Sequence, residues 1–235
     1  MKTKRIEMAA VHRLLQREGL NEGIDNHVSL GLGDGTFLLT PDGVHWEVLT
    51  ASDIVRVDET GRVLEGRAPI DEITFLLHRA AQAAKGNTAC VIHSHMPHTL
   101  AITCTTDGVI EPISQNALRF HGRITYEDHY GGLGFEEEAQ RIGKALRHAD
   151  ILISRNHGVF VTGKSVAEAY DLTYYLERAA KVQVLAKGLD QPLQTVPDDL
   201  ASATAADFAG PANRAEALFA ALIAVLDLRE PDYKT

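Results

Sequence analysis

The stretch ACVIHSHMPHTLAIT, residues 89–103, decides how this chain is interpreted. It opens with the four apolar residues 89–92, as a buried strand does. Two histidines, His93 and His95, follow with a single serine between them. Because successive side chains of a strand point to opposite faces, both imidazoles are expected on one face, where they could bind one divalent metal ion.

A third metal ligand must come from elsewhere in the chain, and the best candidate is His157 in the stretch ILISRNHGVF. This histidine follows an apolar strand and precedes Gly158, where the backbone can turn sharply. Three histidines leave a coordination position open for water or substrate, as in catalytic rather than structural sites. The alternative is that they are ordinary packed residues, because the chain has eleven histidines.

The composition indicates an ordinary globular protein. The chain has 235 residues, of which 45% are hydrophobic and 23% charged, and its formal net charge is −9. No basic patch points to nucleic acid, and no apolar run is long enough for a membrane span. The first residues lack the apolar run of a signal peptide, so we expect a cytoplasmic protein. Cys90 and Cys104 lie in apolar contexts and are predicted to be reduced core residues.

Hydrophobic periodicity predicts strands mainly in the first half and helices alternating with strands later. Helices are predicted over 5–19, 73–84, 134–149, 166–187 and 212–228. Strands are predicted at 27–32 and 36–41, in a hairpin-like unit over 53–66, at the two histidines, and twice within 150–163. Residues 99–105 fit a helix or a strand, 106–132 are expected to be rich in loops, and 189–211 to be a linker. This order indicates an α+β or mixed α/β domain.

Longer stretches resemble the class II aldolase/adducin family. VIHSHMPHTLAIT is similar to its His-x-His strand, and ILISRNHGVFVTGKSVAEAYDLTYYLERAAKVQVLA to its third-ligand segment and the following helix. DNHVSL, FLLTPDGVHWEVLTASDIVRVD and FAALIAVLDLREPDY match the family pattern in order, so the resemblance covers nearly the whole chain. It implies one α/β domain over residues 1–235, with three layers, α/β/α, and a mostly antiparallel central sheet.

The resemblance also implies one divalent metal ion per chain, held by His93, His95 and His157. Zinc or manganese is expected, with iron as the remaining option. The family further implies a homotetramer whose active sites lie between subunits, and a small-molecule substrate rather than nucleic acid or a membrane.

The sequence departs from the sugar-phosphate aldolases of this family at their general acid/base. In those enzymes a glutamate lies four residues before a helix histidine. Aligned on His78, that position is Thr74, and Glu72 and Asp71 lie two and three residues earlier. Glu72 is therefore a candidate catalytic residue, although a surface charge at a helix start explains it equally.

The phosphate-binding residues differ as well. The matching stretch is IDNHVS, which makes Asn26, His27 and Ser29 candidates for the site, and Glu72 takes the place of one of two serines. An acidic group would repel a phosphate. The sequence therefore predicts a small hydroxy- or keto-acid substrate.

The leading prediction is a metal-dependent carbon–carbon lyase, a decarboxylase before an aldolase, that acts through a metal-stabilised enolate. A mononuclear non-heme iron oxygenase and a non-catalytic, adducin-like interaction protein are the alternatives. The candidate catalytic residues are Glu72, His27, His121 and Tyr126. The candidate substrate-binding residues are Asn26, Ser29, Thr74, Arg119 and Arg123, and the two arginines could equally form ion pairs within the protein or between subunits.

Overall fold

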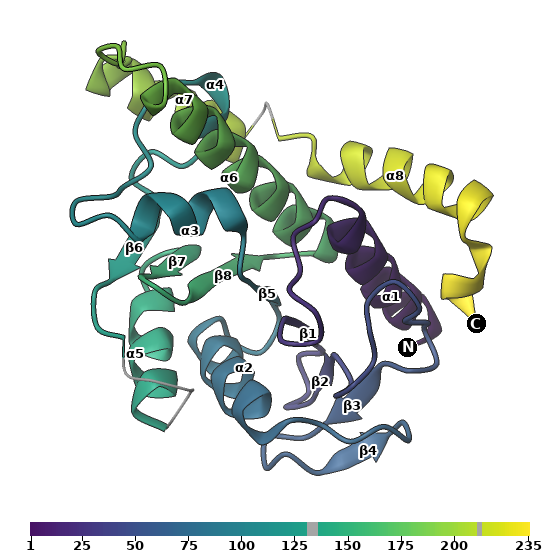
Figure 1. Ribbon diagram of the computed structural model, residues 1–235. Coiled ribbons are helices and arrows are strands. Elements are labelled where there is room, and N and C mark those ends of the chain that lie inside the picture. Colours follow the sequence, from purple (N-terminus) through teal and green to yellow (C-terminus); the bar gives the residue numbers. More distant parts are fainter. Residues whose placement is uncertain (131–135, 211–212) are drawn as a thin grey trace.

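The computed structural model describes residues 1–130, 136–210 and 213–235. Its centre is one eight-stranded sheet (Figure 1). The strands are β1 His27–Gly31, β2 Phe37–Leu39, β3 Val55–Val57, β4 Val63–Glu65, β5 Cys90–Ser94, β6 Ile124–Glu127, β7 Ile151–Ser154 and β8 Gly158–Gly163. Their order across the sheet is β4-β3-β2-β1-β5-β8-β7-β6, and only β6 and β7 are parallel. The predicted α/β domain with a mostly antiparallel sheet is confirmed.

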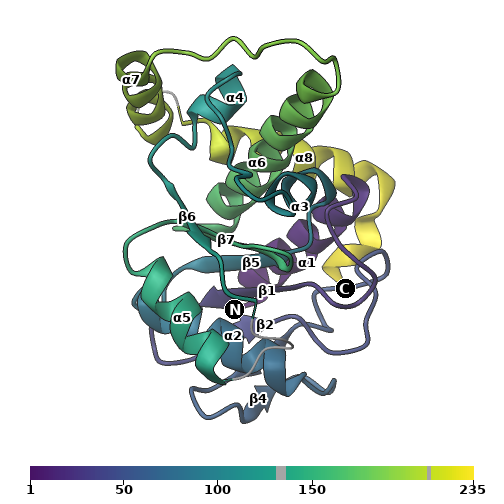
Figure 2. The same cartoon turned by 60° about the vertical axis from the view of Figure 1, so that its left-hand side comes forward.

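Helices cover both faces of this sheet, which gives three layers (Figure 2). They are α1 Lys2–Arg17, α2 Glu72–Ala84, α3 Pro97–Thr103, α4 Gln115–Leu118, α5 Glu136–Leu146, α6 Val166–Lys187, α7 Asp198–Ala209, α8 Ala215–Arg229 and the 3-10 helix η1 Pro231–Lys234. The α2–α5 pair packs on one face of the sheet, and α1 and α6 pack on the other, with α3 and α8 against α6. No helix among the described residues combines the length and the apolar character that a membrane span requires.

Strand β5 lies in the middle of the sheet and divides its side chains between two cores. Cys90 and Ile92 belong to the core beneath α1 and α6, whereas Val91 packs with Leu77 of α2. Alternation along the strand therefore turns His93 toward α2 and α5. Its ring stacks on Phe160 of β8, with 4.3 Å between the ring centroids.

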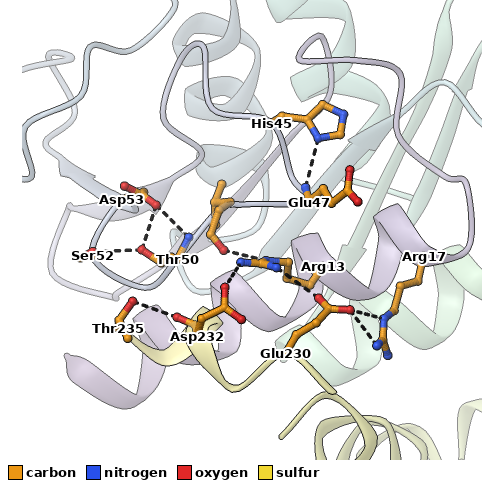
Figure 3. Close-up of polar contacts among 11 residues, drawn as sticks. Arg13, Arg17, His45, Glu47, Thr50, Ser52, Asp53, Glu230, Asp232 and Thr235 are labelled. Atoms are coloured by element: carbon orange, nitrogen blue, oxygen red, sulfur yellow. Dashed lines mark hydrogen bonds and ion pairs between the residues drawn. The ribbon is translucent and has the colours of Figure 1, made fainter. Parts of the chain in front are cut away.

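The C-terminal segment folds back onto the first helix (Figure 3). Arg13, a buried residue of α1, donates to the carbonyl oxygen of Leu49 and pairs with Glu230 at 3.2 Å and Asp232 at 2.7 Å. Glu230 also pairs with Arg17 at 2.7 Å. These ion pairs hold the last turn of the chain against α1. Helix α1 lies on the face of the sheet opposite to α2.

Two expectations about local structure, the linker and the burial of Cys104, need correction. The predicted linker contains α7, whose small Ala201 and Ala205 are buried. The segment expected to be rich in loops is mostly so, although it also contains the short α4 and β6. Residues 97–103 are helical, and Cys104, at the end of that helix, is exposed rather than in the core. Cys90 is buried as expected, and its burial raises the pKa of the thiol. The predicted helix starts at 134 and 212 lie outside the described residues.

Candidate metal centre

Three histidines converge at one end of β5. His93 is on the strand, His95 follows it directly, and His157 lies in the turn between β7 and β8. One ring nitrogen of each lies within 4.8 Å of those of the other two. The Nε2 atoms of His93 and His95 are 3.1 Å apart. Facing imidazole nitrogens at this spacing suit a divalent metal ion bound between them.

The remaining nitrogen, Nδ1, of each histidine is anchored by an oxygen acceptor. The acceptors are the carbonyl oxygen of Val159 for His93 at 3.0 Å, Glu22 for His95 at 2.8 Å, and Glu138 for His157 at 3.0 Å. An Nδ1–H that donates to such an acceptor leaves the Nε2 lone pair for the metal and fixes the ring orientation. The three histidines therefore fit a divalent metal ion in their chemistry as well as in their spacing.

Glu138 is a candidate site residue that the sequence did not reveal. It lies in the first turn of α5, where an acidic residue is expected for the helix dipole alone. Its side chain is nevertheless buried, and its second carboxylate oxygen has no hydrogen-bond partner among the described residues. The helical spacing could have predicted its burial, because Glu138 lies four residues before Ile142 and therefore on the same buried face of the helix.

Gly158 acts differently from the sequence-based expectation. The residue with left-handed backbone in this turn is Asn156, at φ 61°, whereas Gly158 is paired in β8 with Ser154. A Cβ atom on Gly158 would lie 2.7 Å from Cδ2 of His95 and 3.0 Å from Cε1 of His93. The glycine thus provides space for two of the three imidazoles.

We expect Gly158→Ala to weaken metal binding at least about tenfold, because the new methyl group displaces both rings from their common centre. Titration of the metal-free protein with Zn²⁺ in competition with a chelating dye measures this. Gly188→Ala is the comparison variant, since its backbone is right-handed at φ −70° and an added Cβ would meet its nearest atoms at 3.4 and 3.5 Å, an ordinary contact distance. Unchanged zinc affinity in Gly158→Ala would contradict the steric argument.

A cavity of about 340 Å³ opens beside the three histidines. Asn26, His27 and Thr74, all predicted site residues, line it. The charged residues in its wall, apart from the histidines, are Asp25, Asp42 and Asp71, and no lysine or arginine of the described residues takes part. Within one chain, any positive charge for an anionic substrate would therefore come from the metal.

Asn26 lines this cavity and carries an uncharged donor. Its Oδ1 accepts from the backbone N–H of Glu22 at 2.7 Å and lies 3.5 Å from that of His95. Both partners are donors, which assigns the oxygen to that side of the amide. The buried Nδ2 has no hydrogen-bond partner among the described residues, so it is available to a ligand oxygen.

Comparison with known proteins identifies the chain's relatives. Residues 6–184 match the family described as Class II Aldolase and Adducin N-terminal domain. The chain belongs to the class II aldolase/adducin family. An adducin-related protein of Schizosaccharomyces pombe is 31% identical over 188 residues, which cover 76% of this chain and 57% of that protein. The chain thus matches less than two thirds of that relative's length.

Solved structures agree with the fold of this class II aldolase/adducin domain. A crystal structure of an aldolase II superfamily protein from Pseudomonas syringae has a TM-score of 0.91 at 27% identity, over 100% of this chain and 96% of that one. The L-fuculose 1-phosphate aldolase of Glaciozyma antarctica has a TM-score of 0.86 at 20% identity, over 100% and 92%. The second likeness is one of fold alone.

Thr74 and Glu72 occupy different sides of α2 in this class II aldolase/adducin domain. Thr74 is buried at the cavity, and its N–H is capped by Asp71 at 2.7 Å. Glu72 is exposed and does not line the cavity. The expectation that Glu72 gives the site its acidity is therefore wrong, and three aspartates take that place.

Ser29 does not reach the cavity either. It is fully buried, and its Oγ lies 2.6 Å from Nδ1 of His78 and 2.9 Å from Nε2 of Gln82. His78 in turn lies 2.7 Å from Nδ1 of His27. Burial, with the neighbouring His78 next in importance, holds the pKa of His27 well below its usual value. Ser29 was predicted to contact the substrate. Instead it contacts His78, which in turn contacts His27.

The four remaining site candidates of this family member lie away from the cavity of their own chain. His121 pairs with Asp198 at 3.0 Å, Tyr126 Oη accepts from the N–H of Ile110 at 2.9 Å, Arg119 pairs with Asp171 at 3.0 Å, and Arg123 pairs with Asp150 at 3.0 Å. The guanidinium of Arg119 also lies over the rings of Tyr175 and Phe208. Both arginines are therefore engaged by their own chain, in agreement with the ion-pair alternative.

Proposed function

We propose that this chain is a divalent-metal-dependent carbon–carbon lyase for a small hydroxy- or keto-acid, with decarboxylation favoured over aldol cleavage. The observation that carries the proposal is the triad His93, His95 and His157, each anchored through Nδ1, at the wall of an open cavity. When bound there, the metal supplies Lewis acidity, which polarises a substrate oxygen and stabilises negative charge that develops on it.

The charges of the cavity support a carboxylic acid over a phosphorylated sugar. A phosphate dianion at a distance from the metal would meet Asp25, Asp42 and Asp71 and no cationic side chain among the described residues of the same chain. A carboxylate beside a hydroxyl or keto oxygen can instead chelate the metal directly. Asn26 Nδ2 then offers a neutral hydrogen bond to one of the substrate's oxygens.

Thr74 supports decarboxylation. Its side chain lies at the cavity where the sugar-phosphate aldolases would place their glutamate, and a hydroxyl cannot accept a proton as a carboxylate does. Loss of carbon dioxide leaves the bonding electrons on the substrate without removing a proton. The absence of a carboxylate base at position 74 therefore impairs decarboxylation less than aldol cleavage.

The test is a substrate panel with the metal-stripped protein reloaded with Zn²⁺, Mn²⁺ or Fe²⁺. We expect turnover of at least one small hydroxy- or keto-acid, at least about 100-fold above that of fuculose or ribulose phosphates. The reason is that repulsion between the phosphate and the cavity aspartates costs several kcal/mol of binding free energy. Thr74→Glu should not improve turnover of the acid. Exclusive turnover of a sugar phosphate would overturn the substrate class, and oxygen uptake with iron would indicate an oxygenase.

An adducin-like, non-catalytic role is the second candidate, because of the similarity to the adducin-related protein. It predicts no turnover of any panel member even when the metal is bound. The anchored triad favours an enzyme, because an interaction surface needs neither an open coordination position nor Glu138 behind His157.

We also propose that the protein is a homotetramer with sites between subunits, as the family resemblance implies. His121, Tyr126, Arg119 and Arg123 would then serve a neighbouring chain's site or its interface. Light scattering should give a mass of about four times 25.6 kDa. A fully active monomer would remove these four residues from the site.

A further inference from the structure

A buried row of polar side chains leads from α2 to the cavity. It runs from Gln82 through Ser29 and His78 to His27, with neighbouring polar atoms 2.9, 2.6 and 2.7 Å apart. The first three residues are fully buried, and His27 is 7% exposed at the cavity wall. Only the positions of the hydrogen atoms decide what this row presents to a ligand.

The amide of Gln82 is oriented by a group that can only accept. Its Nε2 lies 2.9 Å from the carbonyl oxygen of Ala89 and 2.9 Å from Oγ of Ser29. The first contact requires an N–H donor, so Nε2 donates one hydrogen to Ala89 and the other to Ser29. Ser29 Oγ therefore accepts from Gln82, and its own hydrogen remains to be placed.

Burial fixes the charge of the next residue, because it lowers the pKa of His78 to about 3. The neutral ring carries one hydrogen. If this hydrogen were on Nδ1 and pointed at Ser29, the serine hydroxyl hydrogen would have no acceptor among the described residues. A buried hydroxyl hydrogen without an acceptor is costly, so the serine donates to Nδ1 of His78 instead.

The rest of the row follows from that choice. His78 carries its hydrogen on Nε2 and donates it to Nδ1 of His27 at 2.7 Å. His27 Nδ1 is then an acceptor, and the one hydrogen of its neutral ring is on Nε2. No other hydrogen-bond partner of the His27 ring occurs among the described residues, and its ring stacks on His93 with 4.7 Å between the centroids.

We infer that Gln82, Ser29 and His78 fix His27 as its Nε2–H tautomer, so that His27 donates a hydrogen bond to an anionic oxygen of the ligand in the cavity. His27 is then neither a fourth metal ligand nor a base, since Nε2 has no free lone pair. With Asn26 Nδ2 it forms a pair of uncharged donors beside the metal site. The ligand class rests on the proposed function, whereas the tautomer rests on the hydrogen bonds and on the neutral, buried ring of His78.

Neutron diffraction from deuterated crystals of the zinc-loaded protein tests the tautomer without any assay of activity. We expect deuterium on Nε2 of His27, on Nε2 of His78, and on Ser29 Oγ directed at His78. Deuterium on Nδ1 of His27, or zinc bound to Nε2 of His27, would overturn the inference even if the lyase activity is found.

Binding of oxalate, a metal-chelating dianion, tests the donor role in solution. Calorimetry with zinc-loaded protein should show at least about tenfold weaker oxalate binding in His78→Met, which removes the donor to His27. His78→Gln is the matched variant, because its amide can still donate to Nδ1 of His27, and it should stay within about threefold of the native protein. Equal affinities of all three proteins, at equal zinc content, would contradict the donor role.

Discussion

Replacing His157 by alanine is expected to remove the bound metal and the activity together. The native protein should hold about one divalent ion per chain, and the variant less than about 0.1, because two imidazoles alone hold zinc weakly. Turnover should fall at least about 1000-fold, since Lewis-acid stabilisation is worth several kcal/mol. The fold should survive, because His157 lies in a turn and is only half-buried. Metal analysis by mass spectrometry and circular dichroism measure the two effects.

Two further variants make this result specific to the triad. His93→Ala should behave as His157→Ala, since it removes another of the three imidazoles. His148→Ala changes an exposed histidine that belongs to no metal-binding group of the described residues, and should keep the metal and the activity. A full complement of metal in either triad variant would disprove the proposed site.

The largest effect on stability is expected from Glu177→Ala in α6. This buried carboxylate accepts from the backbone N–H groups of His98 at 2.9 Å and Thr99 at 3.0 Å, and from the Thr99 hydroxyl at 2.8 Å. These N–H groups belong to the first turn of α3, which has no side-chain cap of its own. Alanine leaves them unpaired, and we expect the free energy of unfolding to fall by about 3 kcal/mol.

For a chain of this size the loss corresponds to a Tm lower by roughly 6–12 °C. Thermal and urea unfolding, followed by circular dichroism, measure it. Asp207→Ala is the comparison variant, because this helical acid is exposed, and it should change the stability by less than about 0.5 kcal/mol. A Glu177→Ala protein as stable as that comparison variant would show that α3 does not depend on α6 for its cap.

Local rules predicted the elements that carry the metal triad. Alternation along β5 put His93 and His95 on one face, because the period of a strand is two residues. The helix over 166–187 has the predicted bounds, since Ser165 accepts from the N–H of Glu168 and caps it. The helix at 198–209 was missed because its buried face consists of alanines, which give little hydrophobic contrast against the polar residues around them.

The family resemblance suggested Glu72 and Ser29 as site residues, and the structure places both outside the cavity. Two residues along a helix are separated by roughly 200° about its axis, so Thr74 faces the cavity while Glu72 faces solvent. Ser29 shares the strand face of His27, but it lies one pair further along the strand and meets His78 instead of the cavity. Deciding both cases required the position of α2 against the sheet.

The sequence by itself determined the family, the order of most elements and the residues of the proposed metal triad, because motifs, caps and strand alternation act over a few residues. The tertiary structure alone decided what supports them. His95 and Glu22 are 73 residues apart in sequence, His27 and His78 are 51, and His157 and Glu138 are 19. Hydrogen bonds over such separations depend on how β1, β5, α2 and α5 pack together, and no local pattern of residues specifies that packing.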